Sequence, residues 1–158
     1  MRPIRRLFRT LGVWLQRQNI YDALALQRRG EVRADGLEVT RLTSRLEVEW
    51  WARELHPWDR FASPEKAAFK FVQQTLADTE AAIANLFDAS ALLDVIHLRV
   101  LERGTGRLII DGVVDRSSVE RNPSLSIGMR LVQSGVRFHS FGWGFEPLES
   151  GIGSKDVA

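Results

Sequence analysis

The feature that most constrains the fold of this chain is a long amphipathic segment near its middle. Ser63 suits the N-cap position of a helix, and Pro64 suits the first helical position, where a missing N–H has no cost. From there to about Asp88, mostly apolar residues recur every three or four positions. The row that they form consists of Phe69, Val72, Leu76, Thr79, Ile83 and Leu86. We therefore predict a helix from Pro64 to about Asp88 that packs one face against another element.

Segments with the pattern of β-strands lie on both sides of this predicted helix. They are residues 37–51, 94–102, 107–115 and 136–145. In the first of them, Leu46, Val48 and Trp50 alternate with charged residues, which is the period of a half-buried strand. Gly104-Thr105-Gly106 predicts a hairpin turn between the second and the third. A long helix packed on a sheet of such strands places the chain in the α+β class.

The segment 124–134 decides between two α+β architectures. Its apolar residues lie roughly at helical spacing, and Gly135 suits the position after a helix C-terminus, so we predict a helix. The order of elements is then β-α-β-β-α-β, which is the order of a ferredoxin-like sandwich with two helices on one face of a sheet. If the segment is a strand instead, the alternative is a curved antiparallel sheet wrapped on one long helix, as in cystatin-like or cone-shaped folds.

Composition is that of an ordinary globular protein. The chain has 158 residues, of which 44% are hydrophobic and 27% charged, and we predict a single α+β domain over residues 31–148. It contains no cysteine, which excludes disulfides, thiolate metal sites and a cysteine nucleophile. No apolar run is long enough to cross a membrane, so we expect a cytoplasmic protein, with membrane association left open. Residues 149–158 hold no large apolar cluster, and we expect a disordered tail.

Charge is distributed unevenly along the chain. Residues 1–30 hold seven arginines and one acidic residue, a net charge of +6, whereas residues 31–158 carry a net charge of −4. Over the first 18 residues, helical periodicity separates an apolar arc from an opposite arc of arginines. This basic amphipathic helix is expected to bind an acidic partner or an anionic membrane through Arg2, Arg5, Arg6, Arg9, Trp14 and Arg17.

Other roles for residues 1–30 remain open. The helix could pack on the domain with its arginines in water, which is the commonest role of an amphipathic helix, or it could be a mitochondrial presequence. We do not expect nucleic acid as a partner, because the remainder of the chain is net acidic and its predicted strand 107–115 has no aromatic residue for base stacking.

The most distinctive short segment is His56-Pro57-Trp58-Asp59-Arg60. It combines an imidazole, a large aromatic ring, an acid and a cation in a loop just before a predicted helix N-terminus, where free N–H groups can hold an anion. His56, Trp58, Asp59 and Arg60 are therefore a candidate ligand site. The other interpretation is a structural corner, in which Trp58 fills the core and Asp59 pairs with Arg60 or caps the backbone.

Asp111 and Asp115 form a second candidate site, because both lie on the same face of one predicted strand. Clustered carboxylates can bind a divalent cation or share a proton in acid/base catalysis, whereas the simpler interpretation is a solvated sheet edge that faces nearby arginines. The three histidines, His56, His97 and His139, fall in separate segments, although the last two could meet across a sheet. We predict no metal site. No glycine-rich phosphate loop is present, so no cofactor is expected.

Trp50 and Trp51 are adjacent on a predicted strand and must point to opposite faces of the sheet. One of them therefore lies on the side away from the core, where the N-terminal helices, a second copy or a partner would cover it. We predict a non-enzymatic interaction module that docks onto a protein partner, its own copy or an acidic surface. The alternative is a small enzyme or ligand-binding domain with its site at residues 56–60 or at Asp111 and Asp115.

Overall fold

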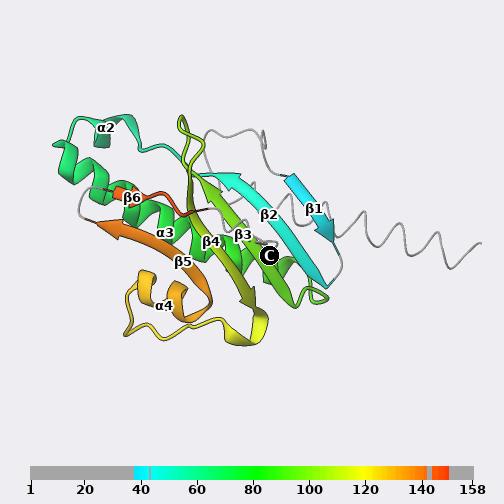
Figure 1. Cartoon of the computed structure of the whole chain (residues 1–158). Helices are drawn as coiled ribbons and strands as arrows, with labels where there is room; N and C mark the ends of the chain where they lie inside the picture. The colour runs from blue at the N-terminus through cyan, green and yellow to red at the C-terminus, as the bar shows by residue number, and fades with distance from the viewer. Residues whose placement is uncertain (1–37, 43, 142–143, 150–158) are drawn as a thin grey trace, which may run out of the picture.

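Six strands and three α-helices make up most of the residues that the structure describes (Figure 1). The computed structural model describes residues 38–42, 44–141 and 144–149. The strands are β1 (Glu38–Leu42), β2 (Arg45–Trp51), β3 (Val95–Leu101), β4 (Leu108–Asp115), β5 (Val136–Phe141) and β6 (Gly144–Glu146). The helices are α2 (Pro57–Arg60), α3 (Pro64–Ala89) and α4 (Ile127–Gln133), and a 3₁₀ helix covers Arg116–Ser118. The predicted N-terminal helix and the tail after Glu149 lie outside the described residues.

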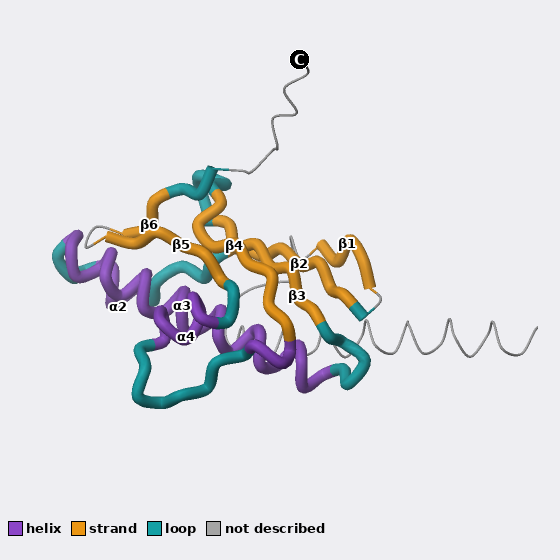
Figure 2. Tube along the Cα trace, turned by 60° about the horizontal axis from the view of Figure 1, so that its bottom comes forward, coloured by secondary structure: helices purple, strands orange, loops and turns teal. Residues whose placement is uncertain are grey.

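The strands lie side by side in the order in which they occur in the chain, and the helices cover one face of the sheet (Figure 2). Only β2 and β3 are parallel, because the connection between them is the long helix α3, whereas every other neighbouring pair is antiparallel. The sheet is thus mixed, and the predicted α+β class is confirmed.

The order of elements from β2 to β5 is β-α-β-β-α-β, as predicted, but the strands are not arranged as in a ferredoxin-like sandwich. That split arrangement places another strand between the two that the first helix joins, whereas β2 and β3 are hydrogen-bonded directly to each other. After α4 the chain returns antiparallel beside β4, so it does not cross back over the sheet to β2. Element order alone does not determine which strands become neighbours.

The helix predicted from Pro64 is observed as α3, the longest element of the fold. Ser63 caps α3, and its hydroxyl accepts a hydrogen bond from the backbone N–H of Lys66. The predicted row is buried from Val72 onward, but Phe69 is 59% exposed. Phe71 takes the inward position at this end of the helix, and its ring lies edge-on to that of Phe145, 6.0 Å away. The buried face of α3 therefore continues through Phe71 and Val72 at this end, and Phe69 lies beside it.

The inner face of the sheet supplies the other half of the core. Leu46, Ile96, Leu98, Ile110 and Val114 are completely buried beneath α3. Their alternation with more exposed neighbours follows the period of two that the sequence showed. A fully buried side chain of this size contributes roughly 1.5–3 kcal/mol through removal from water, so this layer accounts for much of the stability of the domain.

The structure divides two of the predicted strands and confirms the predicted second helix. The extended segment 37–51 is two strands, β1 and β2, and the last predicted strand is likewise a hairpin of β5 and β6. Segment 124–134 contains helix α4, as predicted, and it is capped by Ser126 at its N-terminus. Gly135 follows with a φ of 101°, which is the left-handed conformation expected after a helix C-terminus.

Among the described residues, no helix combines the length and the apolarity that crossing a bilayer requires.

Candidate functional site

The segment 56–60 forms the short helix α2 at the corner before α3 (Figure 1). His56 is its N-cap residue, and the ring Nδ1 atom accepts a hydrogen bond from the backbone N–H of Trp58 at 3.4 Å. Asp59 forms an ion pair with Lys70 of α3 at 2.5 Å, which fastens α2 to the longer helix. The side chain of Arg60 lies outside what the structure describes. His56 and Asp59 thus have structural partners, and nothing in the segment places them on a common ligand.

The segment does form a corner, but the expectation that Trp58 fills the core is wrong. The Trp58 side chain is 79% exposed, and Phe61 directly after α2 is 86% exposed. The inward space beside the start of α3 is occupied by Phe71, which packs against the core together with Phe138 and Phe145. Trp58 therefore points into solvent, and the contact that fixes the corner is the Asp59–Lys70 pair.

The sheet face opposite the helices, called the outer face below, carries charged residues at one register level from β1 to β5. Glu38 on the edge strand β1 lies opposite Glu49 and has the same sign, and the next four strands carry four charges. Glu49, Arg99, Asp111 and Arg137 occupy neighbouring register positions on β2, β3, β4 and β5. Their signs alternate along the row. Arg99 pairs with Glu49 at 2.9 Å, and Arg137 pairs with Asp111. We call these four residues the charged row.

His97 extends this network. Its Nε2 atom lies 3.2 Å from Oδ1 of Asp111, so the carboxylate is shared between the imidazole and Arg137. Asp115 lies on the same face of β4 but is not part of the contact, and His139 opposes Glu146 on β6. The expectation that His97 and His139 could meet is therefore not met, because β4 lies between their strands. Over the described residues, no group of three or more acidic or histidine side chains could hold a metal ion.

The adjacent tryptophans divide between the two faces as predicted. Trp50 is 6% exposed and belongs to the core, whereas Trp51 points to the outer face and is only partly buried. Its ring is covered on one side by the β3–β4 turn, because a Cβ placed on Gly106 would lie 3.9 Å from its Cη2 atom. Leu101 and Val113 add further partly exposed apolar surface to this face.

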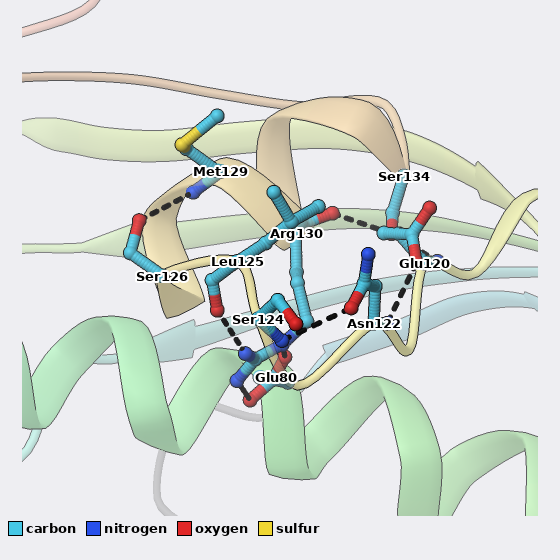
Figure 3. Close-up of polar contacts among 9 residues, drawn as sticks. All are labelled: Glu80, Glu120, Asn122, Ser124, Leu125, Ser126, Met129, Arg130 and Ser134. Atoms are coloured by element: carbon cyan, nitrogen blue, oxygen red, sulfur yellow. Dashed lines mark hydrogen bonds and ion pairs between the residues drawn. The ribbon is translucent and has the colours of Figure 1, made fainter.

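A cleft of about 660 Å³ lies on the helix side of the molecule, between α3 and the segment 119–134. Its α3 wall includes Ala77, Ala81 and Ala84. Figure 3 shows how the opposite wall is fastened: Arg130 donates two hydrogen bonds to Glu80, at 2.6 and 2.9 Å, and a third to the backbone carbonyl of Leu125. The hydrogen bonds to Glu80, together with the charges of Glu80 and Glu120, outweigh the effect of burial and raise the pKa of Arg130 above its ordinary value.

The polar contacts around this cleft hold the fold together. Ser134 accepts a hydrogen bond from the backbone N–H of Glu120 at 2.9 Å and donates one to the carbonyl of Arg130 (Figure 3). Because Arg130 and Glu80 neutralise each other in a bidentate pair, neither offers an unmatched charge to a ligand. A volume of this size suits a small molecule, but the lining does not indicate which chemical class it would bind.

Neither the charged row nor the cleft can be predicted from the sequence, for one reason. Every residue of the charged row was visible as the polar member of an alternating strand, but their proximity depends on the strand order and register. Likewise, Arg130 and Glu80 are 50 positions apart in the chain. No local pattern marks such pairs.

Comparison of the chain with models of protein families, with curated proteins and with solved structures finds no match.

Proposed function

We propose that this chain is a non-enzymatic interaction module that docks onto a second copy of itself through the outer face of its sheet. The observation that carries the proposal is the charged row, which crosses four strands on the face that the described helices leave uncovered (Figure 2). Trp51, Leu101 and Val113 provide apolar surface beside it. A sheet face with both kinds of group is suited to a specific contact.

The order of charges favours a copy of the same chain as the partner. Along the row the signs run negative, positive, negative, positive. A two-fold axis that turns one copy over the other reverses this order, so each acidic residue faces a basic one. Glu49 then lies opposite the second copy's Arg137, and Arg99 opposite the second copy's Asp111. A row with four alternating charges is thus complementary to itself.

Within one copy, the same charges contribute little to stability. The side chains of Arg99 and Glu49 are 43% and 31% exposed, and exposed ion pairs of this kind contribute about 0–1 kcal/mol. Across an interface that excludes water, like charges placed opposite each other cost several kcal/mol. The row therefore has its main effect on association, where it selects partner and register.

A charge exchange tests the proposal. We expect the full chain to be dimeric in sedimentation velocity at low ionic strength, and Glu49→Arg to make it monomeric, because the introduced guanidinium would face the second copy's Arg137. The double variant Glu49→Arg with Arg137→Glu should dimerise again, since opposite charges then face each other. Asp88→Arg on α3 makes the same change in charge away from the outer face and should remain dimeric.

Two results would contradict it. A wild-type chain that stays monomeric at all concentrations rules out the proposed contact. A Glu49→Arg variant that dimerises as well as wild type shows that any dimer uses another surface.

The basic segment 1–30 adds a second part to this proposal. We propose that it attracts the module to an acidic surface, through the arginines at positions 2, 5, 6, 9 and 17 and through Trp14. Its support is the net charge of +6 and the separation of apolar and basic arcs in the sequence. Substitution of the five arginines by glutamine should abolish salt-sensitive binding to anionic vesicles if the segment acts in this way.

The second candidate function is a small enzyme or a ligand-binding domain, and the His97–Asp111 contact favours it. A histidine held by a carboxylate is the usual arrangement of a general base. The pair lies on the outer face, however, and lines neither the cleft between α3 and residues 119–134 nor the cavity next to Phe71. Chemical-shift mapping of the His97 ring during titration with small-molecule libraries would test this candidate, because a ligand at the site must perturb that ring.

A further inference from the structure

Exposed aromatic side chains gather at one end of the molecule. Among the described residues, four aromatic side chains are more than half exposed: Trp58 (79%), Phe61 (86%), Phe69 (59%) and Phe141 (56%). They belong to α2, the first turns of α3 and the end of β5, and these segments lie at the same end of the sheet in both views (Figures 1 and 2). We call these four residues the aromatic end.

The local structure keeps these rings out of the core. The inward positions beside the start of α3 are occupied by Phe71, Phe138 and Phe145, and the ring of Phe145 lies edge-on to those of Phe71 and Phe138 at centroid distances of 6.0 and 6.3 Å. The Asp59–Lys70 ion pair holds α2 in place on the outside. Trp58 and Phe61 therefore project from the surface and cannot fold inward without displacing the Phe71 cluster.

Exposure of large aromatic rings to water is unfavourable in free energy. An aromatic side chain buries roughly 150–250 Å² when it is covered, which corresponds to roughly 25 cal/mol for each Å² removed from water. Isolated exposed apolar residues need no explanation, but a cluster of large rings indicates a contact. Since the rings project outward and line neither the cleft beside α3 nor the cavity next to Phe71, a soft medium that closes around them fits better than a rigid complementary pocket.

The charged residues near these rings indicate which kind of surface the rings contact. Lys66 lies one turn before Phe69 on α3 and is exposed, whereas Lys70, directly after Phe69, is held by Asp59. Residues 56–70 contain three basic and two acidic side chains, a net charge of +1, in a domain that is otherwise net acidic. Aromatic rings beside lysines match the interface of a bilayer, where rings lie at headgroup level and lysine ammonium groups reach anionic phosphates and carboxylates.

We propose that the aromatic end inserts into the headgroup region of an anionic lipid membrane. This inference extends the proposed attraction of residues 1–30 to an acidic surface, because it assigns a separate membrane contact to the folded domain. Trp58, Phe61 and Phe69 belong to the helix side of the molecule, whereas the proposed dimer uses the outer face; Phe141 shares the outer face of β5 with Arg137, so the test rests on Trp58 and Phe61.

The test is co-sedimentation of the full chain with phosphatidylcholine vesicles that do or do not contain phosphatidylserine. We expect binding to the anionic vesicles, and at least about ten-fold weaker binding for the double variant Trp58→Ser with Phe61→Ser. Lys66→Glu should weaken binding at low salt and have less effect at high salt. The matched control is Met129→Ser with Val132→Ser, which removes two exposed apolar side chains from α4 and should bind as wild type.

Each remaining outcome overturns the inference in a recognisable way. If the Trp58 and Phe61 variant binds as tightly as wild type, the membrane contact is made by residues 1–30 alone, and only the attraction to acidic surfaces survives. If wild type binds no vesicles but self-associates, and the variant does not, the aromatic end is a protein contact. Urea unfolding of each variant confirms that the fold is kept, which is expected because both substituted side chains are exposed.

Discussion

Gly135 shows how a single residue determines a connection in this fold. Its φ of 101° turns the chain from α4 into β5, and a Cβ at this position would lie 2.5 Å from the carbonyl oxygen of Val113. The neighbouring Gly112 is equally confined, since its Cβ would lie 2.8 Å from the Cα of Val136. Both glycines allow the start of β5 to approach β4 closely, and no other residue fits there without displacement of the backbone.

A glycine can be required because its φ is positive or because no space exists for a Cβ atom. Two alanine substitutions separate these requirements. Gly104 has a φ of 90° but no atom within 4 Å of its Cβ position, so Gly104→Ala should cost only the conformational strain, about 1–2 kcal/mol. Gly135→Ala adds a clash with backbone and should cost roughly 3 kcal/mol or more. Urea unfolding measures both. Equal losses of stability would show that the backbone at residues 113 and 135 yields easily.

Arg116 is a second residue with a large local effect. Its guanidinium donates to the backbone carbonyls of Phe87, Ser90 and Leu93, at distances between 2.5 and 3.0 Å, and stacks 4.7 Å from the centre of the Phe87 ring. The last turn of α3 contains no basic residue of its own. Arg116 therefore satisfies carbonyls at the C-terminus of the helix from a distant part of the chain.

Arg116→Met should consequently destabilise the fold. The substitution keeps the length of the side chain but leaves several carbonyls without a donor, and we expect a loss of roughly 2–3 kcal/mol in the free energy of unfolding. Arg103→Met is the control, since Arg103 is exposed in the β3–β4 turn. If the two variants unfold at the same urea concentration, water replaces the guanidinium at no cost.

At the scale of elements, the β3–β4 hairpin is held by a small polar cluster at its turn. Glu102 accepts hydrogen bonds from the hydroxyl of Thr105 and the guanidinium of Arg107. Burial of the carboxylate raises its pKa, but the hydrogen bonds from Thr105 and Arg107 and the charge of Arg107 together outweigh burial and lower the pKa below its ordinary value. The ionised form is thus favoured in the folded hairpin.

This shift predicts a pH dependence for the hairpin. A carboxyl group whose pKa is lower in the folded state adds stability above its unfolded pKa of about 4.3, and the contribution disappears as the pH falls through the folded pKa. We expect Glu102→Gln to lose up to about 1 kcal/mol at neutral pH, because the pair is partly exposed, and to match wild type in strong acid. A difference that is constant from neutral to acid pH would show that the ionised form has no special role.

At the scale of the whole molecule, the proposed contacts lie on two separate surfaces. The outer face carries the charged row, and the aromatic end is formed by α2, α3 and β5. A dimer formed through the outer face would leave Trp58, Phe61 and Phe69 of both copies to contact a membrane. Two weak contacts that are joined in this way bind more tightly together than either alone, provided that both can reach the same surface.

The described residues form one continuous hydrophobic cluster between α3 and the sheet, and we expect it to fold without the basic segment. All buried apolar residues in the described part of the chain lie between Leu46 and Val136. A shortened chain that begins at Glu31 should therefore unfold in a single cooperative transition close to that of the full chain, as circular dichroism in urea can measure. Aggregation or loss of the transition would mean that residues 1–30 pack on the domain as part of its fold.

The amino-acid sequence by itself determined the local elements. The apolar period and the Ser63-Pro64 start predict α3, the glycine turn predicts the β3–β4 hairpin, and helical spacing before Gly135 predicts α4. These signals are local, since capping, turn conformation and side-chain period depend on residues that are close in the chain. They were sufficient for the α+β class and for the opposite faces of Trp50 and Trp51.

Only the tertiary structure decided the order of the strands and everything that depends on it. The same order of elements is compatible with a ferredoxin-like sheet and with the sequential sheet observed, and the choice is made by pairing between distant segments. That pairing aligns Glu49, Arg99, Asp111 and Arg137 in one row. Competition for space beside α3, which Phe71 occupies, left Trp58 in solvent, because the volume available to a side chain depends on what the remainder of the chain has already filled.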